Sequence, residues 1–136
     1  TAEEKAFAEE ISKSLNVSLD MSNVEGVEEF DPNAKPGGST DVGDVSFTIP
    51  TVGMSAATWV PGTSAHSWQA VAAGGMSIGE KGMMVAAKTI ALTGMDLIDN
   101  PELVAAAKKE FLEKRGDDFI YTPLLGDRKP ALNYRD

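Results

Sequence analysis

Apolar residues at the helical period predict a helix at the start of the chain. Within residues 2–15 they recur about every 3.6 positions, so they share one face of a helix. Thr1 and Glu4 have the spacing of a capping box, which places the beginning of this helix at Thr1. The acidic residues on the opposite face are interpreted as solvated. The apolar face consists of Ala6, Phe7, Ile11 and Leu15.

A second helix is predicted over residues 77–94. Ser77 and Glu80 again have capping-box spacing, and Gly94 is expected to end the helix as its C-cap. Its apolar stripe is interpreted as a core surface rather than a cofactor surface, because methionine and isoleucine at helical spacing are typical of packed interiors. The stripe consists of Ile78, Met83, Ala86, Ala87 and Ile90.

A third helix is predicted after Asn100 and Pro101, which are typical N-cap and first-turn residues, and it is expected to end at Gly116. Its cations gather in the C-terminal half, where the helix dipole favours positive charge. They are therefore interpreted as a helix end and not as a binding patch. The tail, residues 117–136, is interrupted by prolines and is expected to lie across the surface.

The middle of the chain is less regular. Residues 16–39 lack periodicity and are interpreted as a long loop. A short helix capped by Ser39 or Thr40 is predicted before Pro50, with a strand as the alternative. The segment 51–59, TVGMSAATW, is small, apolar and partly β-branched, which predicts a buried strand followed by a loop. The combination predicts an α/β fold class.

Charge and composition exclude several kinds of partner. The net charge is −9, and residues 1–31 carry nine acids against two lysines. No basic patch is present to neutralise phosphates, so a nucleic-acid partner is excluded and an anionic membrane surface is disfavoured. No apolar run approaches the roughly 20 residues of a membrane span. The chain has no cysteine, which fits a cytoplasmic protein and excludes a thiolate metal site.

His66 is the only histidine, and it follows the expected strand in the segment TSAHSWQAV. A serine nucleophile is disfavoured, because neighbours in an extended chain point in opposite directions. A zinc site requires three or four ligands, and His66 with Asp41 and Asp44 is not a convincing set. From residue chemistry alone, a hydrogen-bonded structural histidine is the favoured interpretation. Trp68 is expected to pack beside this loop rather than to stack on a substrate.

Three motifs in this order resemble the C-terminal part of the metallopeptidase-20 amidohydrolases, the relatives of carboxypeptidase G and the aminoacylases. They are GGSTDVGDVS at residues 37–46, GTSAHSW at 62–68 and KGMMVAAKTIA at 81–91. The pattern is most similar to the aminobenzoyl-glutamate utilization subgroup, the p-aminobenzoyl-glutamate hydrolases. The resemblance extends from the first helix to Gly116.

This resemblance implies a zinc-peptidase-like three-layer α/β catalytic domain. Residues 1–136 would form one segment of it, the part that follows an inserted dimerisation domain. His66 would be a ligand of a dinuclear site holding zinc or manganese. Gly38, Ser39, Thr40 and Asp41 would line the cleft, with Asp41 beside the ligands or at a helix cap. Asp44 and Ser46 belong to the motif, but the resemblance assigns them no role.

The resemblance also implies what this segment lacks. The remaining metal ligands and the glutamate general base lie upstream of the inserted domain in that family, so no catalytic residue is expected here and the chain alone is expected to be inactive. The absence of an initial methionine is consistent with a fragment or a processed chain. The expected activity is hydrolysis of p-aminobenzoyl-glutamate, in a homodimer or hetero-oligomer. The alternatives are a general N-acyl-amino-acid or dipeptide hydrolase, or a non-catalytic α/β interaction module.

Overall fold

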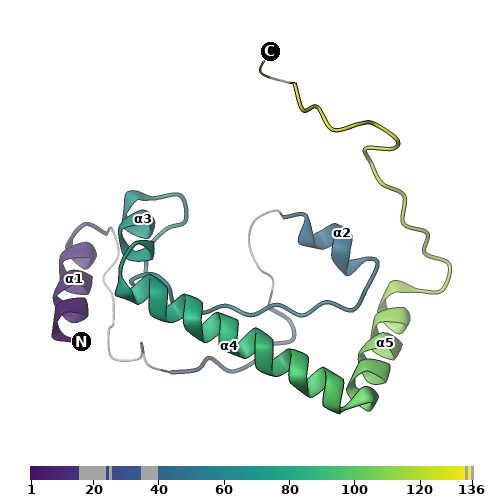
Figure 1. The fold of residues 1–136 in the computed structure, drawn as a ribbon, viewed down its shortest axis with the longest axis horizontal. Helices are drawn as coiled ribbons and strands as arrows, with labels where there is room; N and C mark the ends of the chain where they lie inside the picture. Colours follow the sequence, from purple (N-terminus) through teal and green to yellow (C-terminus); the bar gives the residue numbers. More distant parts are fainter. Residues whose placement is uncertain (16–23, 25, 35–39, 134, 136) are drawn as a thin grey trace. The chain divides into compact units, whose positions relative to one another are not determined.

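A computed structural model describes residues 1–15, 24, 26–34, 40–133 and 135. Helices are the regular elements of the described residues (Figure 1). They separate into two compact units, which are Thr1–Gly37 with Gly53–Asp99, and Gly38–Val52 with Asn100–Asp136. The helices are α1 (Ala2–Lys13), α2 (Val42–Ser46), α3 (Trp68–Gly74), α4 (Ser77–Asp99) and α5 (Pro101–Arg115).

The predicted α/β fold class, with its three-layer catalytic domain, is wrong for this structure. Where the sequence predicted a buried strand, residues 51–58 have no regular secondary structure, and no strand occurs in the described ranges. Val52 and Met54 in this segment are 80% and 44% exposed. A β-branched, apolar sequence favours extended backbone, but a strand also needs a neighbour for its N–H and C=O groups. The described part of the chain offers this segment no such neighbour.

Helix α1 begins where the sequence predicted. The Thr1 hydroxyl accepts a hydrogen bond from the Glu4 amide at 3.2 Å, and the Glu4 carboxylate accepts one from the Thr1 nitrogen at 2.7 Å. The predicted capping box is therefore confirmed. The helix buries Ala8 and Ile11 against Val60, which are 6%, 4% and 2% exposed. Partly buried side chains complete this core: Phe7, Leu15, Ala72 and Ile78.

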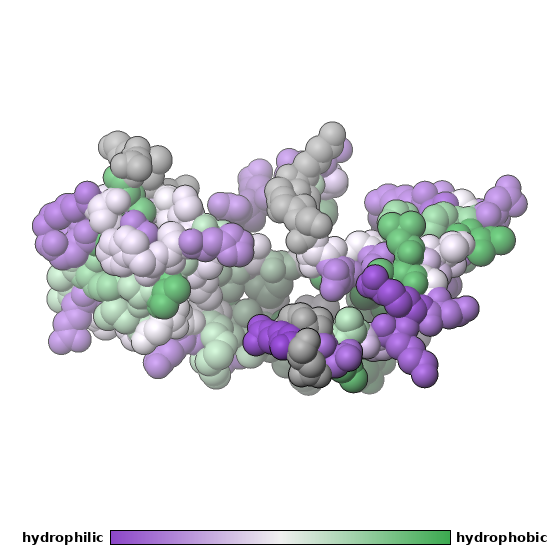
Figure 2. Space-filling model, turned by 90° about the horizontal axis from the view of Figure 1, so that it is seen from above, coloured by the Kyte–Doolittle hydropathy of each residue, from purple (hydrophilic) through white to green (hydrophobic). Residues whose placement is uncertain are grey.

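Helix α4 differs from its prediction in its start, its end and its buried face. The predicted capping box is wrong, because the Glu80 amide donates to the Met76 carbonyl at 3.1 Å and the Ser77 hydroxyl donates to Glu4. It continues through Gly94 to Asp99, so Gly94 is not its C-cap. Of the expected core stripe, Ile78 packs against the core, whereas Met83 and Ile90 are 58% and 64% exposed. Apolar residues accordingly lie on the surface of the molecule (green in Figure 2). The buried residues of α4 are instead two glycines, Gly79 and Gly82.

Glu4 connects α1 to the first turns of α4. Its carboxylate accepts hydrogen bonds from the Ser77 hydroxyl and from Lys81 Nζ, each at 2.6 Å, and its side chain is only 15% exposed. Lys81 first, and with it the Ser77 hydroxyl, lower the pKa of Glu4 well below its usual value of 4.5, because both stabilise the charged form. One carboxylate therefore both caps α1 and attaches it to α4.

The Glu4→Gln variant is expected to be less stable than wild type at neutral pH, because an amide gives up the charge-assisted bonds to Lys81 and Ser77. Since folding lowers the pKa of Glu4, this contribution is complete above the usual value of 4.5 and decreases as the pH falls further. Chemical denaturation of purified wild type and Glu4→Gln at several pH values measures their free energies of unfolding. The difference between wild type and variant should be present at pH 7 and should shrink on acidification.

Glu3→Gln is the matched control for this prediction. Glu3 lies in the same first turn, so the variant removes the same charge from the same helix end. Its side chain is exposed and bonds to neither Ser77 nor Lys81. Equal stability losses for Glu3→Gln and Glu4→Gln would contradict a specific attachment of α1 to α4.

The second unit is organised by aromatic side chains around α2 and α5. Phe47 follows α2 and stacks on Phe119, with ring centroids 5.1 Å apart and planes inclined by 16°. The Arg115 guanidinium lies 4.9 Å from the Phe111 ring centroid and 5.9 Å from that of Phe119. Such cation–π contacts hold the end of α5 against the residues that follow it.

Both ends of α5 agree with the sequence prediction. Asn100 occupies the N-cap position and Pro101 the first turn, and Gly116 is the C-cap with φ 85°. A left-handed φ of this kind favours glycine. The following residues to 133 contain turns but no helix, and Leu124 is fully exposed. No helix in the described part of the chain has both the length and the apolar character needed to cross a membrane.

Candidate functional site

His66 lies in the turn that precedes α3, and its backbone is unusual. Its φ is 61°, and among the described residues it is the one non-glycine residue with a positive φ. The left-handed conformation costs an L-residue about 1–2 kcal/mol. Strain of this kind is retained where the surroundings fix it, and it is concentrated at functional sites. The backbone thus singles out the same residue as the sequence motif.

Ser67 fixes the backbone immediately after His66. Its hydroxyl accepts a hydrogen bond from the Ala70 amide at 3.2 Å, which caps α3, and donates one to the Ser64 carbonyl at 2.7 Å. The imidazole of His66 is therefore presented from a turn that is closed on its C-terminal side by a capped helix. Helix α3 is absent from the sequence prediction, although a serine three residues before the Ala70 amide is a recognisable cap signal.

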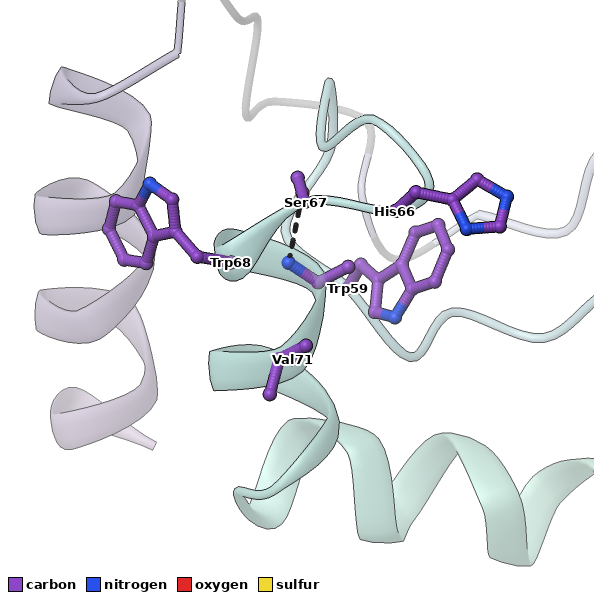
Figure 3. A pocket seen from close by; sticks show the side chains of 6 residues that line it. Trp59, His66, Ser67, Trp68 and Val71 are labelled. Carbon is purple, nitrogen blue, oxygen red and sulfur yellow. Dashed lines mark hydrogen bonds between the residues drawn. The ribbon is translucent and has the colours of Figure 1, made fainter. Parts of the chain in front are cut away.

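Trp59 and His66 lie side by side at an open hollow of about 570 Å³ (Figure 3). The Trp59 indole is 40% exposed and stands next to the imidazole, whereas the Trp68 side chain projects to the other side, towards α1. Trp68 is 61% exposed, so it is less enclosed than the expected packing residue. The lining residues are Trp59, His66, Ser67, Trp68, Ala70 and Val71.

The position of Trp59 is set by contacts on both sides of it in the sequence. Val60 is 2% exposed in the core, and Ala57 and Thr58 lie against Gly82 of α4. The sequence prediction did not single out Trp59, because it placed this residue at the end of a strand. Its adjacency to His66 results from the turn over residues 60–63, closed by a 3.2 Å bond from the Thr63 amide to the Val60 carbonyl.

The predicted cleft residues are only partly described. Gly38 and Ser39 lie outside the described residues, so their expected role stays a prediction. Thr40 and Asp41 directly precede α2 in the second unit, where the Thr40 hydroxyl accepts a bond from the Val42 amide at 3.4 Å. Asp41 occupies the N-cap position without a side-chain capping bond. His66 belongs to the first unit, whereas Thr40 and Asp41 belong to the second.

The two motif residues without an expected role have local partners in the second unit. The Ser46 hydroxyl donates to the Gly43 carbonyl at 2.7 Å, within α2. Asp44 lies beside Tyr121, whose pKa is raised first by burial and then by its hydrogen bond to Asp44 and the charge of that carboxylate. Both contacts are structural, so neither residue is assigned to a metal.

Metal-ligand geometry can be assessed only for the described residues. Among them, no three histidine, cysteine or acidic side chains come together as a potential metal site. His66 nevertheless has the properties of a single ligand, because its imidazole is exposed and its backbone is fixed by the adjacent cap. A neutral imidazole nitrogen is a common ligand for divalent metals.

Two curated proteins match the chain. One is a subunit of the p-aminobenzoyl-glutamate hydrolase of Escherichia coli (strain K12), 42% identical over 93 residues, which are 68% of this chain and 19% of that protein. The other is the Xaa-Arg dipeptidase of Mus musculus, 37% identical over 78 residues, which are 56% of this chain and 17% of that protein. The chain thus spans less than a fifth of either relative. No family model matches it, and no solved structure matches it.

Proposed function

Because the chain is a relative of the metallopeptidase-20 amidohydrolases, we propose that it is one segment of a metal-dependent amidohydrolase. Since the match covers under a fifth of each relative, the proposed activity belongs to a longer protein in which this segment contributes part of the site. The substrate proposed for that protein is p-aminobenzoyl-glutamate, cleaved to p-aminobenzoate and glutamate. A dimeric or hetero-oligomeric cytoplasmic enzyme is part of the same proposal.

The observation that carries the proposal is the geometry of His66. A residue held at φ 61° in front of a capped helix presents its imidazole in a fixed direction, at the cost of backbone strain. The motif resemblance implies a metal ligand at this residue, and the relatives are named as a hydrolase and a dipeptidase.

In the proposed site, His66 binds one of two divalent metal ions, zinc or manganese. When bound, such ions lower the pKa of a water molecule and polarise the scissile carbonyl. His66 has to be neutral to ligate, so its role requires that the imidazole be unprotonated. The Ser67 cap orients the imidazole. That Gly38, Ser39, Thr40 and Asp41 line the cleft of the longer protein stays a prediction from the motif resemblance. The general base and the other ligands come from outside residues 1–136.

The substrate assay uses the full-length protein reconstituted with zinc or manganese. We expect release of p-aminobenzoate from p-aminobenzoyl-glutamate, loss of that activity after treatment with a chelator, and its recovery when the metal is restored. Absence of amide hydrolysis in the metal-loaded protein, or hydrolysis that a chelator leaves unchanged, would contradict the proposed function.

A general acyl-amino-acid or dipeptide hydrolase is the second candidate. It is favoured by the match to a protein named Xaa-Arg dipeptidase. Parallel assays with acetyl-glutamate and a dipeptide ending in arginine separate the candidates. A preference for the dipeptide over p-aminobenzoyl-glutamate would favour this second candidate.

A further inference from the structure

The hollow beside His66 has walls suited to an uncharged ring. Its lining contains no charged side chain, and Trp59, Ala70 and Val71 present apolar surface. The one hydroxyl, on Ser67, is already engaged with the Ala70 amide and the Ser64 carbonyl. None of these side chains offers an ionic partner to a carboxylate or a guanidinium, whereas their apolar surface can contact a ring. The lining therefore selects the uncharged part of a substrate.

Trp59 is the side chain best placed to bind such a ring. Its indole is next to the imidazole, whereas Trp68 projects to the other side (Figure 3). Its backbone is held on one side by the buried Val60 and on the other by the close approach of Ala57 to Gly82. A rigid indole loses little conformational freedom on binding, and aromatic rings stack favourably on one another.

We infer that Trp59 stacks on the aromatic acyl group of the substrate and so positions the scissile amide beside His66. The inference rests on the proposed function and adds to it where each half of the substrate binds. The p-aminobenzoyl ring occupies the hollow at Trp59, and the charged glutamate part lies outside it. One matching relative is named for a p-aminobenzoyl-glutamate substrate, whose acyl half is such an uncharged ring.

The kinetic test compares two glutamate amides in the full-length, metal-loaded protein. One is p-aminobenzoyl-glutamate and the other is acetyl-glutamate, which has the same carboxylates but no ring. Trp59→Leu should raise KM for the aromatic amide about tenfold, as expected for a lost aromatic stack, and change KM for acetyl-glutamate less than about twofold. Trp59→Phe should restore most of the aromatic preference.

Equal effects of Trp59→Leu on the two substrates would overturn the inference. A binding measurement distinguishes failure of the inference about Trp59 from failure of the proposed function. Chelator-treated, metal-free protein is titrated by calorimetry with p-aminobenzamide, which has the same ring and an uncharged amide. Binding that weakens about tenfold in Trp59→Leu supports the ring site even where hydrolysis is absent. Binding that is the same in wild type and Trp59→Leu overturns it.

Discussion

Replacing Gly82 by alanine is expected to destabilise the first unit by about 1–3 kcal/mol, as overpacking of a well-packed contact does. A Cβ atom at this position would lie 2.7 Å from Thr58 Cγ2 and 2.8 Å from the carbonyl carbon of Ala57. One of these atoms is backbone, so the clash cannot be relieved by rotating a side chain. Helix α4 would have to move away from residues 57–58. Urea denaturation of the purified protein measures the change.

Gly94→Ala is the matched control within the same helix. Gly94 also lies inside α4, but a Cβ atom there would meet nothing within 4 Å. Alanine is favoured over glycine in a helix interior by about 1 kcal/mol, so this variant should be more stable than wild type. Alanine raises the helix propensity equally in both variants. The difference between their free energies of unfolding therefore measures the effect of the contact at Gly82. Equal stabilisation in the two variants would contradict the close approach of α4 to residues 57–58.

Helix ends were predictable from the sequence where short-range chemistry determines them. Thr1 with Glu4, and Asn100 with Pro101, begin α1 and α5 as predicted. Gly94 was misread as an end because glycine is the usual C-cap residue. A glycine inside a helix costs only about 1 kcal/mol, and the helix continues past it until Pro101, whose ring and missing N–H prevent continuation.

The packing was less predictable than the helices. Hydrophobic periodicity identified Met83 and Ile90 as core residues, yet both are exposed. The buried face of α4 is made of Gly79 and Gly82, because close backbone contact requires the absence of a side chain. Hydrophobic patterning assigns no burial to glycine, so it does not detect such a face. For segment 51–59, composition indicated extended backbone but not the lack of a strand partner.

The candidate site was predicted in part. The motif identified His66, and the structure adds its left-handed backbone, which an isolated histidine in a sequence does not signal. Helix α3 was missed although Ser67 is a standard cap residue, since the segment was interpreted as a loop. The neighbouring Trp59 was missed because its position depends on the turn at residues 60–63, which is a three-dimensional property.

Replacement of His66 is expected to have the largest effect on activity. In the full-length protein, His66→Ala should lose one metal equivalent and lower the rate of amide hydrolysis by at least about 100-fold, since even partners of metal ligands contribute 10–100-fold. His66→Gly should lose the same metal while relaxing the left-handed backbone, so its metal-free form should be at least as stable as metal-free wild type. Comparing the two variants separates the ligand role of the imidazole from the strain of its backbone.

The metal content of full-length His66→Gly, measured by inductively coupled plasma mass spectrometry beside wild type, tests the central claim most directly. The glycine variant keeps the backbone conformation that the turn requires, and so a loss of metal cannot be attributed to a disrupted turn. A ligand role for His66 predicts one metal equivalent fewer per chain, with an unfolding midpoint of the chelator-treated variant no lower than that of chelator-treated wild type. The same metal content in wild type and His66→Gly would contradict it.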